Sequence, residues 1–125
     1  MNLDFASVWE MISDIVPDNN ALICGDEIVS WKDYDERSSK IASALSNAGL
    51  KANSKAGLYL NNSNEYLIGQ NAIFKIGGVP INVNYRYVAE ELIYLLDNSD
   101  SEAVFYHACY SSRIKEIADS LPNIK

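Results

Sequence analysis

The sequence contains no threonine, a single histidine and two cysteines, and its ten lysine and arginine residues are scattered along the chain. Because no basic cluster is present and the net charge is −7, we expect no nucleic-acid binding. No apolar run approaches the roughly 20 residues that span a bilayer, so no membrane span is predicted. The first residues, MNLDFASVWEM, carry acids instead of a basic segment. They resemble neither a secretory signal nor a transit peptide, and a cytoplasmic protein is predicted.

The few residues that could bind metal or carry redox chemistry are far apart. Cys24 and Cys109 each lie in an apolar stretch, and neither has a second Cys or a His at the spacing of a metal site. This pattern predicts two buried, free thiols and no metal ligands. His107 has no serine or cysteine partner in the sequence, so a structural or surface role is favoured over that of a general base.

Apolar residues are plentiful, and their spacing predicts a regular order of elements. Asp4 can cap a first helix that Pro17 ends, two short apolar runs around Gly25 read as a β-hairpin, and Ser30 can cap a second helix that ends at Gly49. Strands and helices alternate after that. The expected strands are 57–60, 79–83 and 103–106, and the expected helices are 63–76, 88–96 and 111–121.

This alternation predicts an α/β fold with parallel strands joined by crossover helices, a βαβαβα unit preceded by a helix, a hairpin and a helix. The strand residues expected near the core are Leu58, Leu60, Val79, Ile81 and Phe105. A chain of 125 residues forms one domain or a fraction of a larger one.

Gly77 and Gly78 lie between an expected helix and an expected strand. Loops that cradle phosphate place their glycines after a strand and before a helix, which is the reverse order. A structural turn is therefore predicted here, since glycine adopts left-handed backbone conformations at little cost.

The run FKIGGVPINVNYRYVAEELIYLLDNSD, residues 74–100, resembles the early part of the acyl-CoA synthetases, which belong to the adenylate-forming, AMP-binding superfamily. Residues 28–50 and 103–122 resemble the flanking parts of the same enzymes. The resemblance implies that residues 1–125 are one partial domain of a larger AMP-binding domain. Within it, residues 1–50 would form a cover and residues 51–125 the βαβαβα unit.

The resemblance also implies a function for the complete enzyme, in which a fatty acid or similar apolar carboxylate reacts with ATP and coenzyme A to give acyl-CoA, AMP and pyrophosphate, assisted by Mg²⁺. The partners would be the remainder of the synthetase and, in a possible homo-oligomer, further copies. The family's nucleotide loop is rich in Ser, Thr and Gly and ends in Pro-Lys, and no such loop is present here. This chain alone is therefore expected to hold no cofactor and no catalytic residue, and to be inactive.

Two arginines are the candidate ligand-binding residues. Arg86 follows an expected strand, at the edge where parallel sheets bind ligands, and Arg113 opens a helix in a region that approaches the phosphates of coenzyme A in the family. The alternatives are a clamp at the helix entry for Arg86 and a solvated surface position for Arg113. Glu90 and Glu91 suit the start of a helix and do not indicate a catalytic pair.

A second interpretation remains open, that of a self-contained, flavodoxin-like α/β module that binds a partner or regulates. Its support is the chain length and the fold pattern. Against it, the residues after Leu60 are Asn61, Asn62 and Ser63, which do not form the Ser/Thr-rich loop that flavin binding needs.

Overall fold

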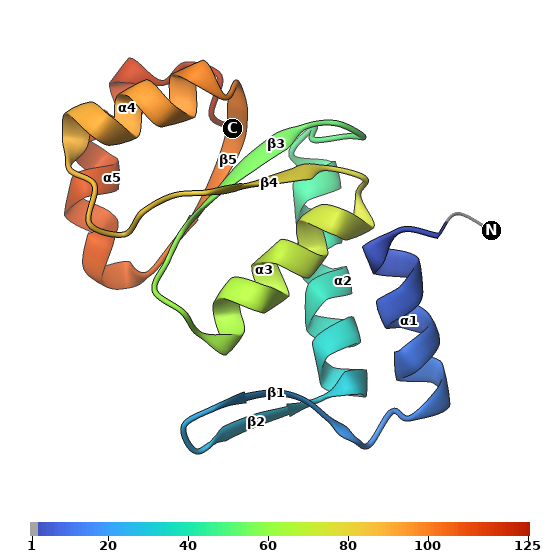
Figure 1. Ribbon diagram of the computed structural model, residues 1–125. Coiled ribbons are helices and arrows are strands. Elements are labelled where there is room, and N and C mark those ends of the chain that lie inside the picture. Colours follow the sequence, from blue (N-terminus) through green and yellow to red (C-terminus); the bar gives the residue numbers. More distant parts are fainter. Residues whose placement is uncertain (1–2) are drawn as a thin grey trace.

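The computed structural model describes residues 3–125, and residues 1 and 2, which the sequence analysis includes in the first segment, lie outside that range. Its elements follow the predicted order (Figure 1). They are α1 (Phe5–Ile15), β1 (Asn20–Cys24), β2 (Glu27–Ser30), α2 (Trp31–Asn47), β3 (Lys55–Tyr59), α3 (Asn64–Lys75), β4 (Val79–Asn82), α4 (Ala89–Asn98), β5 (Ser101–Tyr106), η1 (Ala108–Tyr110), α5 (Ser111–Ile117) and η2 (Ala118–Ser120).

The predicted caps begin the first helices. The Asp4 carboxylate accepts a hydrogen bond from the backbone N–H of Ser7 at 2.8 Å, and the Ser30 hydroxyl accepts one from Asp33 at 3.1 Å. Each cap satisfies a backbone donor that the first helical turn leaves unpaired. Between the two helices, β1 and β2 form the predicted antiparallel hairpin.

The three-stranded sheet is parallel, in the order β4-β3-β5, with β3 at its centre. Alternate residues of β3 face opposite sides, so that Leu58 packs toward α3 while Tyr59 packs toward α4 and α5. Both side chains are fully buried, which is why the strand sequence lacks an apolar–polar alternation.

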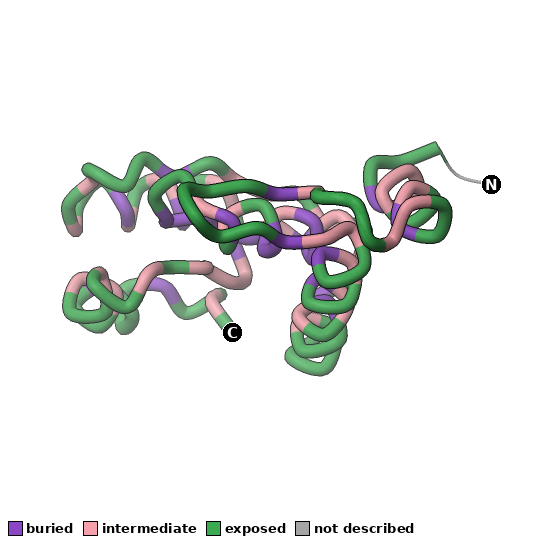
Figure 2. Tube along the Cα trace, turned by 90° about the horizontal axis from the view of Figure 1, so that it is seen from below, coloured by how far each residue is buried: buried purple, intermediate pink, exposed green. Residues whose placement is uncertain are grey.

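Helices cover both faces of this sheet. In Figure 1, α3 lies on one face with α2 and α1 beyond it, and α4 and α5 lie on the opposite face. Figure 2 shows that buried positions concentrate where these layers meet. On the first side, the ammonium of Lys75 joins the three helices by contacting the carboxylates of Glu10 and Asp35, each at 2.7 Å.

The Gly77–Gly78 turn is structural, as predicted. Gly77 has a φ of +73°, in the left-handed region that favours glycine. A Cβ on Gly78 would lie 2.9 Å from the carbonyl oxygen of Ser54, so only glycine fits at this close approach. Beyond it, the Val79 N–H donates to that same carbonyl at 2.8 Å and starts the pairing of β4 with β3.

Three predictions about burial are wrong. Cys24 and Cys109 are free but exposed. Cys24 pairs with Glu27 at the end of the hairpin that projects into solvent, and Cys109 lies in η1, beyond the end of β5. Val79 is 40% exposed because it begins β4, an outer strand of the sheet.

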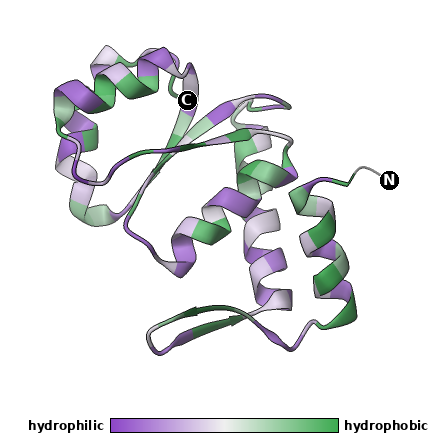
Figure 3. Ribbon diagram, in the orientation of Figure 1, coloured by the Kyte–Doolittle hydropathy of each residue, from purple (hydrophilic) through white to green (hydrophobic). Residues whose placement is uncertain are grey.

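Hydrophobic residues are prominent in the hairpin (Figure 3), where Ile23 and Ile28 pair on the exposed side. The helices within residues 3–125 are all too short or too polar to cross a lipid bilayer.

Candidate functional site

At the carboxyl ends of the neighbouring strands β3 and β5, the chain leaves the sheet toward opposite faces. The helix after β3 packs on one face of the sheet, and the helix after β5 packs on the other. Ligands of open parallel sheets bind at such switch points. The candidate site therefore consists of the residues at this edge.

Arg113, near the start of α5, reaches back to this edge. Its Nη1 donates to the hydroxyl oxygen of Tyr59 at 2.8 Å and to the backbone carbonyl of Tyr87 at 3.0 Å. The Tyr59 hydroxyl in turn donates to the Tyr87 carbonyl at 2.9 Å. The three groups, which we name the Arg113 hub, connect the end of β3, the loop after β4 and α5.

The acceptors in the Arg113 hub are neutral oxygens, so the charge of the guanidinium is not cancelled by them. Within residues 3–125, Arg113 makes no ion pair with a carboxylate. The hydrogen bond to Tyr59, with a smaller contribution from Glu116, raises the pKa of Arg113 above its ordinary value. Nη1 is the only nitrogen of Arg113 that donates to a described residue. The Nε–Nη2 edge, whose shape suits a phosphate or carboxylate group, makes no hydrogen bond to a described residue.

Tyr110 closes the same edge from the side of β5. Its ring lies 4.6 Å from that of Tyr59, centroid to centroid, and its hydroxyl donates to the Asn61 side-chain oxygen at 2.6 Å. Burial is the main reason that the pKa of Tyr110 is raised. The carboxyl ends of the two neighbouring strands are thus fastened together.

Arg86 lies in the loop after β4 and is exposed. Its backbone N–H donates to the Asn84 side-chain oxygen at 2.9 Å, and its guanidinium lies over the Tyr85 ring at 5.5 Å. Within residues 3–125 the side chain makes no hydrogen bond or ion pair. The bond from the Arg86 N–H to Asn84 is a local turn contact, and the helix-entry clamp considered for Arg86 stays a prediction. Arg113 is half-buried in the Arg113 hub and does not occupy the solvated position considered for it.

A cavity of about 280 Å³ lies beside the end of β5, on the α2 and α3 side. Leu60, Ile68 and Phe105 form part of its apolar wall, and His107 and Glu65 supply polar groups. His107 is half-buried, and no hydrogen bond joins it to a serine, cysteine or carboxylate of residues 3–125. This geometry offers no relay for acid–base catalysis.

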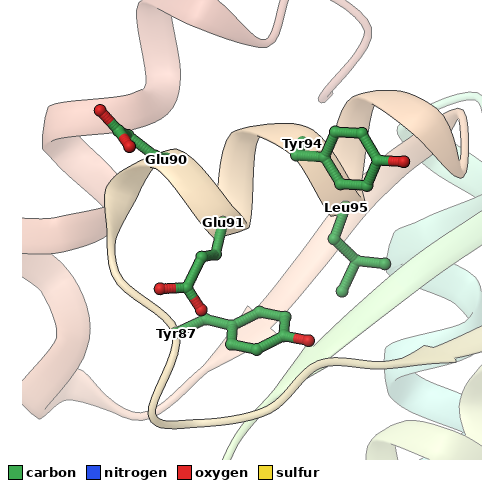
Figure 4. A pocket seen from close by; sticks show the side chains of 5 residues that line it. All are labelled: Tyr87, Glu90, Glu91, Tyr94 and Leu95. Atoms are coloured by element: carbon green, nitrogen blue, oxygen red, sulfur yellow. The ribbon is translucent and has the colours of Figure 1, made fainter.

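A second cavity, of about 350 Å³, adjoins the N-terminal half of α4 (Figure 4). Figure 4 shows the Glu91 side chain pointing toward Tyr87, whereas Glu90 points to the other side of the helix. Both carboxylates lie in the first turn of α4 and are exposed, as the sequence suggests. Their negative charge opposes the binding of a phosphorylated ligand in this cavity.

Comparison with known proteins identifies the family. The family model described as AMP-binding enzyme matches residues 13–125. The chain belongs to the AMP-binding enzyme family. Its curated relatives in this family include the medium/long-chain-fatty-acid–CoA/3-oxocholest-4-en-26-oate–CoA ligase of Mycobacterium marinum, 40% identical over 98% of the chain. They also include the 3-oxocholest-4-en-26-oate–CoA ligase of Rhodococcus rhodochrous, 36% identical over the whole chain.

Solved structures of the AMP-binding family share the fold. The N-terminal domain of FACL13 from Mycobacterium tuberculosis superimposes with a TM-score of 0.89 over all of this chain and 33% of its own, at 22% identity. A benzoate CoA ligase from Burkholderia xenovorans LB400 gives a TM-score of 0.88 over 95% of this chain and 24% of its own, at 18% identity. The predicted α/β fold and the resemblance to the N-terminal part of acyl-CoA synthetases are confirmed.

The match covers only part of the AMP-binding relatives, because the chain spans 22% of the length of each of the two curated ligases. No group of three or more His, Cys, Asp or Glu side chains within residues 3–125 could hold a metal ion. These described residues thus offer Mg²⁺ no cluster of carboxylates.

The sequence analysis missed Tyr59, Tyr110 and Asn61 as members of the site. Tyr59 looks like an ordinary core residue, since it ends a buried apolar strand. Its contact with Arg113 joins residues 54 positions apart, and local spacing carries no signal of it. Asn61 and Tyr110 could have been found from their places directly after strands β3 and β5.

Proposed function

We propose that the chain is the N-terminal part of an ATP-dependent acyl-CoA ligase that acts on a fatty acid or a similar apolar carboxylate. The observation that carries this proposal is the 40% identity with the M. marinum ligase along 98% of the chain. The substrate class follows from the names of the curated relatives. ATP, Mg²⁺ and coenzyme A would be used by the complete enzyme, in the cytoplasm, where the sequence analysis also places it.

In this proposal, residues 3–125 act as a scaffold and contribute one wall of the coenzyme A site. The Nε–Nη2 edge of Arg113 would contact a phosphate of coenzyme A, and Arg86 would supply a second, more mobile positive charge from the exposed loop. The remainder of the ligase would provide the nucleotide loop and the metal ligands. We include in the proposal that residues 1–125 form part of one larger AMP-binding domain and that they are inactive alone.

The experiment measures the two half-reactions separately. The complete protein that carries this chain is given ATP, Mg²⁺ and a panel of carboxylates, and carboxylate-dependent exchange of pyrophosphate into ATP reports adenylation. Thioester formation with coenzyme A reports the second step. We expect both activities for apolar carboxylates, and no exchange from residues 1–125 alone. Absence of exchange with every carboxylate in the complete protein would refute the ligase proposal.

A further inference from the structure

We propose that Tyr59 is a positioning residue for the thioester-forming step, because its hydroxyl fixes the direction in which Arg113 presents its free edge. This inference rests on the proposed ligase function and deepens it. It concerns a residue that lies in the core and that would not itself touch the substrate. Tyr59 would act through Arg113 alone.

Burial fixes the position of Tyr59. Its side chain is fully buried, with Leu92 and Leu96 of α4 and Ile117 of α5 in the same core cluster, and the Tyr110 ring stacks against it. A ring enclosed in this way has one position. The hydroxyl is therefore a fixed point at the carboxyl edge of the sheet.

The Tyr59 hydroxyl makes two hydrogen bonds. It accepts from Arg113 Nη1 at 2.8 Å and donates to the Tyr87 carbonyl at 2.9 Å. A hydroxyl can do both at once, whereas a phenylalanine ring can do neither. The side chain of Arg113 has many rotamers. If the hydrogen bond to the Tyr59 hydroxyl were lost, a ligand would have to order this side chain, at a cost in binding free energy.

The two groups that hold Arg113, the Tyr59 hydroxyl and the Tyr87 carbonyl, are uncharged. A carboxylate would hold Arg113 equally well but would cancel its charge and compete with a phosphate for the guanidinium. A tyrosine hydroxyl and a backbone carbonyl hold it without doing so. The Arg113 hub is thus suited to present a charged guanidinium to an anionic ligand, which in the proposed reaction is the phosphorylated end of coenzyme A.

The test uses the complete protein with Tyr59→Phe, Arg113→Ala, the double substitution, and Tyr34→Phe as a matched control. Tyr34 is also buried, at 4% exposure, and its hydroxyl donates to the Leu67 carbonyl at 3.3 Å on the opposite side of the sheet. Both tyrosine substitutions remove one buried hydroxyl and keep the ring. A general loss of stability would therefore affect both variants alike.

We expect Tyr59→Phe to raise the KM for coenzyme A about three- to tenfold, the effect of one lost hydrogen bond, with carboxylate-dependent pyrophosphate exchange unchanged. Tyr34→Phe should leave that KM unchanged. The double variant should be no worse than Arg113→Ala, because Tyr59 acts only through Arg113. With pantetheine as the acyl acceptor, which has the thiol and no phosphate, Tyr59→Phe should match the wild type.

An unchanged KM for coenzyme A in Tyr59→Phe would overturn the inference, as would an equal loss with pantetheine. Hydrogen exchange tests, independently of any activity, whether the Tyr59 hydroxyl holds the loop whose Tyr87 carbonyl is the second acceptor of Arg113. The Tyr87 N–H, which donates to the Asn84 carbonyl at 3.0 Å, should exchange faster in Tyr59→Phe and not in Tyr34→Phe. Equal exchange in both would overturn the inference even if the protein proved not to be a ligase.

Discussion

Two cations in this molecule are held in opposite ways. Lys75, on the side of the sheet that carries α1 and α2, has a side chain only 8% exposed and contacts two carboxylates at 2.7 Å. Arg113, on the other side, contacts only neutral oxygens among the described residues. A buried cation that serves the fold needs its charge balanced, whereas one that serves a ligand must keep its charge available. The comparison indicates that Lys75 serves stability, and it supports the proposal that Arg113 serves binding.

The largest expected effect is that of Lys75→Met on stability. The change leaves the carboxylates of Glu10 and Asp35 close together without their common partner. We expect the free energy of unfolding to fall by about 2 to 3 kcal/mol, less than for a fully buried pair because both carboxylates are partly exposed. Urea unfolding followed by Trp9 and Trp31 fluorescence measures this.

Lys40→Met, on the exposed face of α2, is the control for Lys75→Met and should change stability by less than about 0.5 kcal/mol. If both lysine variants have the same free energy of unfolding as the wild type, the assignment of Lys75 to stability is wrong.

Arg113→Met should give the reverse pattern. The Tyr59 hydroxyl keeps its hydrogen bond to the Tyr87 carbonyl, so the free energy of unfolding should change by less than about 1 kcal/mol. In the complete protein, if the proposed ligase function holds, the KM for coenzyme A should rise roughly tenfold or more, with adenylation unchanged, and Arg113→Lys should restore it only in part. If Arg113→Met lost as much stability as Lys75→Met, Arg113 too would serve the stability of the fold, and the contrast between the two cations would be wrong.

The pH dependence of the Lys75 contribution is a smaller effect. Burial alone would lower the pKa of Lys75, but the hydrogen bonds that its ammonium donates to the Asp35 and Glu10 carboxylates, together with their negative charges, outweigh burial and raise the pKa above 10.5. Its stabilising contribution is then complete below that pH and is lost as the pH rises through the raised pKa. The difference in unfolding free energy between the wild type and Lys75→Met should stay constant up to about pH 10 and shrink as the pH rises further.

Comparing the two proteins at each pH removes the contribution of groups they share. One of these is Tyr34, whose pKa burial raises to about 12. A difference that stays constant over the range would count against the ion pairs.

Salt should produce the smallest effect. Raising the ionic strength shortens the screening length and weakens the attraction between Arg113 and a phosphate at the partly solvated site. We expect the KM for coenzyme A to rise about twofold between roughly 0.05 and 0.2 M salt in the wild type, and less in Arg113→Met. Equal salt dependence in both proteins would show that other charges attract coenzyme A.

Much of the fold could be predicted from the sequence because its signals are local. Asp4 and Ser30 mark helix starts, Gly77 marks a helix end, and the apolar run of β3 identifies a strand buried on both faces. Those features depend on residues three or four positions apart. Exposure was harder to predict, as Val79 illustrates, because an apolar residue at the start of an outer strand has the same sequence pattern as one in the core.

The candidate site was predicted only in outline. Arg86 and Arg113 were placed correctly at the carboxyl edge, since both follow strands of a parallel sheet. The Arg113 hub could not be foreseen, because the contact between Arg113 and Tyr59 depends on how α5 packs on the sheet. A tyrosine at the end of a strand gives no indication of whether its hydroxyl meets water, a carbonyl or a guanidinium.

The close approach of Gly78 to the Ser54 carbonyl also determines how the chain can vary in length. Because it aligns Val79 with Lys55, it decides which residues of β4 face α3 and which face α4. Adding one residue between Gly78 and Pro80 would turn Ile81 away from the α4 side and bring Asn82 into the apolar layer. Natural length variation in this protein should therefore occur in the hairpin turn at Gly25, which has open space around it, and not at the junction of α3 with β4.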